Sequence, residues 1–368
     1  MGDDSSNLPN KKTDIEMARK NVTLTEVAQA AKVSPMSASR AINNRTGVSP
    51  ETREHVLKVA ADLGYVTNRT AQKLSGGRSH VIGVIATELE NQYTSTLIAA
   101  ISEAAWEVGY ETLIYSHVER EKRPSGSVVQ LLRQISDGVI AILPLEFGYL
   151  SELAAINIPV ITVDHVSEQA EFPSVTTDCY EGTCMALRHL ISLGHRKIAY
   201  IAGDERLASA RDRRRAYLET MDQYGLGSDS DYIVEGDFTR LRGFEATTAL
   251  LSLDRPPTAI FAANDLSAFG AIAAIKMAGL RVPDDVSVIG FDDIPFSAEY
   301  SPALTTVRQP LQQIGHSAVN TLLALIVGIS PTAPQVSLPT ELIVRSSTAI
   351  AQPSRKTSKT SKIRKPGR

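Results

Sequence analysis

Three short amphipathic segments between residues 22 and 66 are the feature that most restricts how this chain can fold. The first carries apolar residues at the i, i+3, i+4 and i+7 spacing of one buried helical face, namely Leu24, Val27, Ala28 and Ala31. Serine-proline pairs at 34–35 and 49–50 predict two further helix starts, because serine accepts a hydrogen bond from a free amide and proline already has a helical φ. Segments this short bury one face only by packing together, which predicts a small three-helix core.

The second segment, predicted as a helix over residues 35–43, has an outward face that this core does not need. Ala38, Ala41 and Ile42 fall inward at i, i+3, i+4. The opposite face carries Pro35, Met36, Ser39, Arg40 and Asn43. Such a face fits a groove in another molecule, whereas a generic helical bundle is the alternative interpretation.

Residues 23–66 resemble the DNA-binding head of the lac repressor (LacI-type) family. The matching stretches are Thr23-Leu24-Thr25-Glu26-Val27-Ala28, Val33-Ser34, Ser39-Arg40-Ala41-Ile42-Asn43, Val48-Ser49-Pro50-Glu51-Thr52-Arg53 and Leu63-Gly64-Tyr65-Val66. The resemblance continues through residues 68–74, which are similar to the family's hinge helix, and at lower density to about residue 350. It implies a helix-turn-helix domain whose second helix enters the major groove of double-stranded DNA.

The resemblance also implies which side chains contact DNA. They are Thr23, Ser34, Pro35, Met36, Ser37, Ser39, Arg40, Asn43, Asn68, Ala71 and Leu74. Arg40 is expected to make the bidentate contact to guanine that arginine provides. Pro35 and Met36 depart from the polar residues of many relatives, so contact with a thymine methyl is their expected role. Leu74 is expected to wedge into the minor groove, with packing on its own lobe as the alternative.

Charge is distributed unevenly along the 368 residues, although the formal net charge is only −3. Residues 1–80 carry 12 basic and 8 acidic side chains, residues 81–350 carry 19 and 33, and residues 351–368 carry seven basic and no acidic ones. A polyanion is therefore attracted to the ends and repelled by the middle, which fits nucleic acid binding at the head. The tail alone is more typical of a solvated low-complexity end.

Several functional classes are not expected. Residues 1–21 lack the apolar core of a signal peptide and no run is long enough to span a bilayer, so we expect a cytoplasmic protein and no membrane partner. Cys179 and Cys184 lack further ligands at metal spacing, so we expect buried thiols, no metal and no cofactor. Without an HExxH, P-loop or G-x-S-x-G motif, an enzyme is not expected. A transport solute-binding protein is not expected either, because it would need an export signal and would have no use for a DNA-binding head.

From residue 81 onward, short apolar strands alternate with amphipathic helices, which is typical of parallel sheets built from βαβ units. The predicted strands are 81–86, 111–115, 138–142 and 159–163, followed from about residue 180 by 197–201, 232–235, 259–262 and 286–290. Ligands of such sheets bind at the C-terminal ends of the strands, so two neighbouring sets of strands predict a cleft.

This body resembles the family's effector domain, a two-lobed α/β periplasmic-binding-protein-like fold whose chain crosses between the lobes three times. The implied organisation is a disordered arm (1–21), a helix-turn-helix domain (22–66), a hinge helix and linker (67–77), an effector-binding and dimerisation domain (78–350) and a basic disordered tail (351–368). Lobe 1 is expected over about 81–179 and 308–329, and lobe 2 over about 180–307 and 330–350.

Five side chains are predicted to bind the effector, namely Tyr93, Asp164, Arg213, Phe238 and Asp265. Asp265 follows an apolar strand and opens a helix, where a carboxylate can accept ligand hydroxyls, with a helix N-cap as the alternative. The resemblance implies that Arg213 forks onto ligand oxygens, although four arginines within residues 211–215 are typical of a solvated face. It implies a stacking role for Phe238. Asp292 and Asp293, after the strand 286–290, are also expected at an end of the cleft, although the resemblance implies a structural role for Asp292.

The resemblance thus implies a ligand-responsive transcriptional regulator, most commonly a repressor, that binds a pseudo-palindromic operator as a homodimer. Carboxylates, an arginine and aromatic rings describe a carbohydrate or nucleoside pocket better than a purely apolar one, and a sugar-like effector is the expectation. Control by a partner protein, or by a nucleobase or nucleoside corepressor, is the alternative. The effector's identity, the operator sequence, the choice between induction and corepression and the role of the tail do not follow from the sequence.

Overall fold

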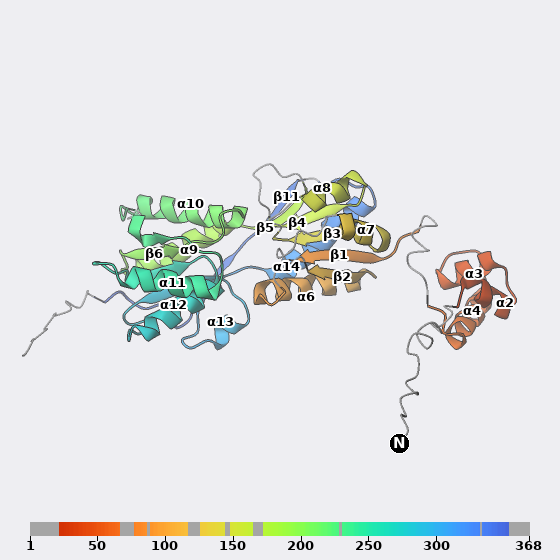
Figure 1. Ribbon diagram of the computed structural model, residues 1–368, viewed down its shortest axis with the longest axis horizontal. Coiled ribbons are helices and arrows are strands. Elements are labelled where there is room, and N and C mark those ends of the chain that lie inside the picture. Colours follow the sequence, from red (N-terminus) through yellow and green to blue (C-terminus); the bar gives the residue numbers. More distant parts are fainter. Residues whose placement is uncertain are drawn as a thin grey trace, which may run out of the picture. The chain divides into compact units, whose positions relative to one another are not determined.

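The computed structural model describes residues 22–66, 77–86, 89–116, 126–143, 148–164, 172–227, 230–331 and 333–352. The chain divides into two compact units, residues 1–77 and 78–368 (Figure 1). The arm predicted over 1–21, most of the hinge over 67–77 and nearly all of the tail over 351–368 lie outside the described residues. The predicted DNA contacts Asn68, Ala71 and Leu74 lie outside them as well.

The described part of the first unit consists of the helices α2 (Leu24–Ala30), α3 (Pro35–Ile42) and α4 (Pro50–Asp62). Each begins after a hydroxyl side chain that accepts a hydrogen bond from a free helix amide, namely Thr23, Ser34 and Ser49. The core between the helices is built mostly from small residues, namely Val27, Ala28, Ala31, Ala38, Ala41, Val56 and Ala60. The predicted three-helix core is confirmed, and α3 ends one residue earlier than predicted because Asn43 is its C-cap.

The second unit contains two six-stranded sheets, each covered by helices. In the first sheet the strand order is β11-β5-β4-β3-β1-β2 and all neighbours are parallel. These strands are β1 (Val81–Ala86), β2 (Glu111–Ser116), β3 (Gly138–Ile142), β4 (Val160–Val163), β5 (Ser174–Thr177) and β11 (Gln335–Leu338). The helices of this lobe are α6 (Gln92–Glu107), α7 (Gly126–Ile135), α8 (Gly148–Ala155) and α14 (Leu311–Ile326).

In the second sheet the strand order is β12-β10-β9-β8-β6-β7, with only β12 antiparallel to its neighbour. These strands are β6 (Ile198–Ile201), β7 (Ile233–Val234), β8 (Ala259–Ala262), β9 (Ser287–Asp292), β10 (Thr305–Arg308) and β12 (Glu341–Ile343). The helices are α9 (Cys179–Ser192), α10 (Ala208–Gln223), α11 (Arg240–Leu251), α12 (Asp265–Met277) and α13 (Phe296–Glu299), with a 3-10 turn η1 (Ser230–Tyr232).

The chain crosses between the two sheets after β5, after β10 and after β11, so both lobes are discontinuous in sequence. The prediction that lobe 2 resumes at residue 330 is wrong for β11, which pairs with β5 in the first sheet. Its side chains Val336 and Leu338 pack against the apolar core there, and its backbone satisfies the open edge of β5. Only β12 returns to the second sheet.

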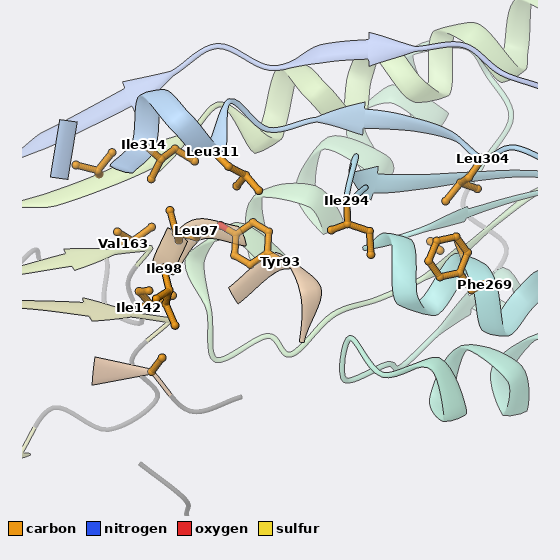
Figure 2. Close-up of a cluster of buried hydrophobic side chains, with 14 of the residues drawn as sticks. Tyr93, Leu97, Ile98, Ile142, Val163, Phe269, Ile294, Leu304, Leu311 and Ile314 are labelled. Carbon is orange, nitrogen blue, oxygen red and sulfur yellow. The ribbon is translucent and has the colours of Figure 1, made fainter. Parts of the chain in front are cut away.

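Apolar packing joins the lobes beside the crossing strands (Figure 2). Figure 2 shows Tyr93 of α6 and Leu311 of α14 between the first-lobe side chains, such as Leu97, and Ile294 of the second lobe. All of these residues belong to one buried cluster. The contact between the lobes therefore rests on apolar burial as well as on the connecting strands.

Candidate functional site

The face of α3 that turns away from the helical core carries the residues predicted to read DNA. Met36 is 64% exposed and Arg40 is exposed, whereas Ala38 and Ala41 are buried. Thr23 is the N-cap of α2, and its hydroxyl and the Glu26 carboxylate form a reciprocal capping box. The exposed face of α3 is therefore not occupied by packing within the described part of the first unit.

Short polar contacts stiffen this helix. The Ser37 amide donates to Ser34 Oγ at 3.0 Å, and the two hydroxyl oxygens lie 2.9 Å apart. Near the other end, the Asn43 side-chain amide donates to Ser39 Oγ at 3.3 Å. Pro35 occupies the first helical position, where its missing N–H costs nothing. All the partners lie within four residues, so the sequence alone predicts most of this arrangement.

Arg53 of α4, which the sequence does not single out as functional, holds the C-terminal end of α3. Its guanidinium donates to the carbonyl oxygens of Ala41 at 3.2 Å, Arg45 at 2.7 Å and, more weakly, Arg40 at 3.4 Å. A positive charge at a helix C-terminus is also favoured by the helix dipole. Arg53 therefore positions α3, the candidate reading helix, against the core. The only signal for this role of Arg53 in the sequence is that it lies in the stretch 48–53, which resembles the lac repressor family.

A cavity of about 350 Å³ lies in the second unit, where the C-terminal ends of strands from both sheets meet. Its lining includes the residues directly after β4, β5 and β10, and residues two or three positions after β6 and β8, and thus fits the rule for ligand sites in parallel sheets. The volume is within the range of about 300 to 1,000 Å³ typical of small-molecule sites. Tyr93, Asp164, Arg213 and Phe238 all line it, as predicted.

Arg213 of α10 is buried, with 3% of its surface exposed, and its guanidinium is only partly satisfied by the protein. Nη1 donates to the Ala263 carbonyl at 2.8 Å and Nη2 to Cys179 Sγ at 3.5 Å, while the guanidinium carbon lies 3.9 Å from the centre of the Phe291 ring. Within the described part of the chain, the buried Nε has no hydrogen-bond partner. Arg213 therefore has donors left for a ligand.

The neighbouring arginines differ from Arg213. Arg214 pairs with Glu205 and Arg215 pairs with Asp212, and all four of these side chains are at least 40% exposed. The alternative of a solvated arginine face is therefore correct for these two residues and wrong for Arg213.

Asp265 departs from its prediction. It is completely buried, it is absent from the lining of the cavity, and its carboxylate is satisfied by the protein. Oδ2 accepts hydrogen bonds from the Ile294 amide at 3.0 Å and Ser297 Oγ at 2.6 Å, and Oδ1 accepts one from the Thr306 hydroxyl. Against the prediction, Asp265 therefore does not face the cavity: the carboxylate instead ties α12 to β10 and to the loop after β9.

The N-cap alternative for Asp265 is also wrong, because the N-cap of α12 is Asn264. Asn264 Oδ1 accepts from the Ser267 amide at 2.9 Å, and Nδ2 donates to the Phe238 carbonyl at 2.9 Å. Asn264 also lines the cavity. A one-residue offset at a helix start thus decides which of two polar side chains faces the cavity.

Asp292, which was expected at an end of the cleft but with a structural role, lines the cavity. It is 6% exposed, and its Oδ1 accepts a hydrogen bond from Gln309 Nε2 at 2.7 Å. Gln309 Oε1 in turn accepts one from Thr177 Oγ1 at 2.8 Å, so the carboxylate is linked to two crossing segments. Burial raises the pKa of Asp292, although Arg213 and Gln309 oppose the shift. Burial and the nearby Asp292 raise the pKa of Asp265 as well.

The remaining predicted residues reach the cavity by different routes. Tyr93 lies in the first turn of α6 and not in a loop. Asn91 is the N-cap of that helix, because its Oδ1 accepts a hydrogen bond from the Tyr93 amide at 3.0 Å. Asp164 follows β4 with φ of +62°, and Phe238 has φ of +67°. A β-carbon at Gly203 would lie 2.1 Å from the Phe238 ring, so the glycine makes room for it.

Cys179, Asn264 and Gln309 line the cavity without having been predicted to do so. Cys179 was expected to be a buried thiol, which the structure confirms. Burial raises the pKa of that thiol, with Arg213 opposing the shift. Within the described residues, no group of three or more His, Cys, Asp or Glu side chains is arranged to hold a metal ion. None of the helices in that part of the chain is both long and apolar enough to cross a membrane.

Comparison with known proteins agrees with both units. The family described as bacterial regulatory proteins, lacI family, matches residues 23–68, and a periplasmic binding protein-like domain matches residues 187–348. The lactose operon repressor of Escherichia coli (strain K12) is 36% identical over 333 residues, which cover 89% of this chain and 91% of that repressor. The repressor CytR of the same strain is 32% identical over 327 residues, covering 89% and 96%.

Solved structures show the same similarity. The lac repressor dimer bound to operator and the anti-inducer ONPF aligns with a TM-score of 0.80 at 34% identity, covering 90% of this chain and all of that one. The complex of the transcriptional regulator CelR with cellobiose aligns with a TM-score of 0.68 at 28% identity, covering 89% and 100%. With relatives more than 30% identical over nearly nine tenths of its length, the chain belongs to the lacI family of bacterial regulatory proteins.

Proposed function

We propose that this regulator is a transcriptional repressor that binds a pseudo-palindromic operator as a homodimer and is switched by a small sugar-like effector. The observation that carries the proposal is the cavity between the two lobes, where Arg213 keeps an unused buried donor beside the carboxylate of Asp292. The relatives support it, since one solved repressor dimer is bound to operator and one regulator is bound to cellobiose.

Operator reading is assigned to α3. Its exposed face enters the major groove, with Arg40 on guanine and Met36 against a thymine methyl. Two heads in a dimer then contact two half-sites, as the symmetry of a homodimer requires. A DNA partner of this kind places the protein in the cytoplasm.

Sugar binding is assigned to the cavity, because its lining matches a ligand with many hydroxyl groups. Hydroxyls both donate and accept: the carboxylates of Asp164 and Asp292 accept, and the free Arg213 N–H groups donate. The Phe238 ring offers an apolar face on which a sugar ring can stack. An apolar ligand would offer no acceptor to the buried Nε of Arg213.

A thermal-shift screen of the full chain against sugars and nucleosides tests the effector assignment. A ligand present at about 100 times its dissociation constant stabilises the folded state by about 2.7 kcal/mol. Arg213→Ala should abolish the shift produced by the best hit. Arg214→Ala, in the same helix but outside the lining, is the matched control and should leave it unchanged. Equal shifts in both variants would refute the assignment, and a nucleoside hit would replace the sugar.

Coupling between the two activities is assigned to the hinge, with Asn68, Ala71 and Leu74 as its proposed DNA contacts. Isolated helices shorter than about 12 residues are marginal in water, so we propose that this segment becomes helical only on the operator. Ligand and operator then affect each other's binding reciprocally, typically by about 5- to 150-fold. Leu74→Ala should weaken operator binding far more than binding to random DNA. Equal losses on both DNAs would exclude a minor-groove wedge.

A further inference from the structure

Carboxylates outnumber cations around the cavity. Among the described residues, the acidic ones in the lining are Asp164, Asp178, Asp204, Asp212, Asp237 and Asp292, whereas the basic ones are Arg213 and Arg215. An anionic ligand would therefore enter a site whose own field opposes it.

The exposed acids are compensated only in part. Asp204 pairs with Arg206 at 2.7 Å and Asp212 with Arg215 at 3.0 Å, in side-chain pairs that solvent reaches and screens. Asp178 and Asp237 accept hydrogen bonds from backbone amides, and in the described part of the chain neither is paired with a cation. The mouth of the cavity thus keeps an excess of negative charge.

Among the described residues, the interior offers an anion a single cation, Arg213, whose charge already interacts with the carboxylate of Asp292. The Arg213 guanidinium lies on the Phe291 ring and donates to Ala263 and Cys179. Two buried carboxylates, Asp164 and Asp292, line the same space. Burial raises the pKa of Asp292, so negative charge is already disfavoured there. A phosphate or carboxylate that reached Arg213 would add a further buried negative charge.

On the basis of the proposed sugar-binding function, we infer that the effector is a saccharide without a negative charge and that sugar phosphates and sugar acids are rejected. Hydroxyl groups satisfy Arg213 as acceptors and the two buried carboxylates as donors at no cost in charge. The protein would therefore discriminate neutral from anionic sugars in two ways: by contacts to the neutral sugar, and by the unfavourable energy of a negative charge placed near the carboxylates.

The test uses the full chain and calorimetric titration with a panel of neutral mono- and disaccharides, each with its 6-phosphate and its uronic acid counterpart. The best neutral sugar should bind at least about tenfold more tightly than either anionic counterpart, which is about 1.4 kcal/mol. An anionic counterpart that binds as tightly as the neutral sugar, or more tightly, would overturn the inference while leaving the saccharide function intact. If no saccharide binds, the proposed function itself fails.

A second arm separates charge from size, because a phosphate is also larger than a hydroxyl. Asp164→Asn keeps the shape of a lining residue and removes its charge. The ratio of the dissociation constants of the anionic and the neutral sugar should therefore decrease at least about threefold. Glu181→Gln, which removes an exposed acid outside the lining, is the control and should leave the ratio unchanged. An unchanged ratio in Asp164→Asn, with neutral-sugar binding retained, would show that size and not charge excludes the anions.

Discussion

Helix α3, the candidate reading helix, and the candidate effector cavity present their polar side chains in opposite ways. In α3 the candidate contacts lie outside the core, and the polar side chains at its two ends have partners within four residues, with Arg53 reaching the helix from 8 to 13 residues away. In the cavity the polar groups are buried, and their partners lie 50 residues away for Arg213 and Ala263 or 132 residues away for Thr177 and Gln309. Local sequence therefore controls the first site, whereas the second exists only once both lobes have folded.

This difference has an energetic side. A polar group removed from an exposed face leaves water in its place, so substitutions there usually change stability by less than about 0.5 kcal/mol. A buried group whose partner is removed loses its hydrogen bond with no water to replace it, at about 1 to 3 kcal/mol for each orphaned partner. Substitutions among the buried polar groups of the second unit should therefore change stability, whereas substitutions on the exposed face of α3 should change binding specificity.

The largest effect is expected at Asp265. Asp265→Ala leaves three buried donors, from Ile294, Ser297 and Thr306, without their acceptor and should cost more than about 3 kcal/mol of unfolding free energy. Urea denaturation measures this, and Asp212→Ala, which breaks only an exposed pair, should cost less than about 0.5 kcal/mol. A loss of less than about 1 kcal/mol at Asp265 would break the contrast between buried and exposed groups.

Arg53 tests whether any residue of the first unit behaves like the buried network. Arg53→Ala removes hydrogen bonds to the carbonyl groups of Ala41 and Arg45, and hydrogen bonds to a charged group are worth about 1.5 to 3 kcal/mol. Hydrogen exchange of the α3 amides should speed up accordingly and operator binding should weaken. Arg45→Ala is the control: it keeps the backbone carbonyl that Arg53 contacts, so the exchange rates of the α3 amides should stay as in the parent. Unchanged exchange in Arg53→Ala would mean that α3 is held by apolar packing alone.

Arg40 should show the opposite behaviour to Asp265. Arg40→Ala is expected to cost about 1 to 3 kcal/mol of operator binding and to relax specificity at one base pair. Because Arg40 is exposed, unfolding of the protein should be nearly unaffected. Binding titrations against single-base operator variants measure the change. An operator footprint and specificity identical to those of the parent would remove Arg40 from the reading surface.

The smallest effect is expected from pH. Burial lowers the pKa of His195, whose ring contacts Thr258, Ser287 and the Ala349 carbonyl at 3.0 Å each. An unfolded histidine takes up a proton near pH 6.5, while the folded one stays neutral to lower pH. The unfolded state then binds more protons, so this contribution to stability is present above about pH 6.5 and is lost as the pH falls.

The raised pKa values of Asp265 and Asp292 make stability fall as the pH rises, which is opposite to the effect of His195. The contribution of His195 is therefore measured as the difference between the parent and a His195 variant, because both proteins share the two carboxyl groups. His195→Gln should be less stable than the parent at neutral pH, and the difference in melting temperature should narrow toward pH 5. A difference that stays constant between those two pH values would show that His195 does not titrate on unfolding.

The sequence by itself determined the features whose partners are close along the chain. The N-caps at Thr23, Ser34 and Ser49 and the small three-helix core followed from residue type and spacing, because a helix start depends on the next few amides. The βαβ pattern likewise predicted the two sheets and placed a cleft at their strand ends.

Only the tertiary structure decided which polar residues face that cleft. Asp265 and Asp292 both follow an apolar run in the sequence, yet Asp265 is turned toward Ile294 and Thr306 while Asp292 lines the cavity. The membership of β11 in the first sheet was decided in the same way, by an open strand edge that no local pattern reports. The physical reason is common to both: a buried carboxylate or an unpaired strand settles where distant donors are left unsatisfied, and those donors are brought near only by folding.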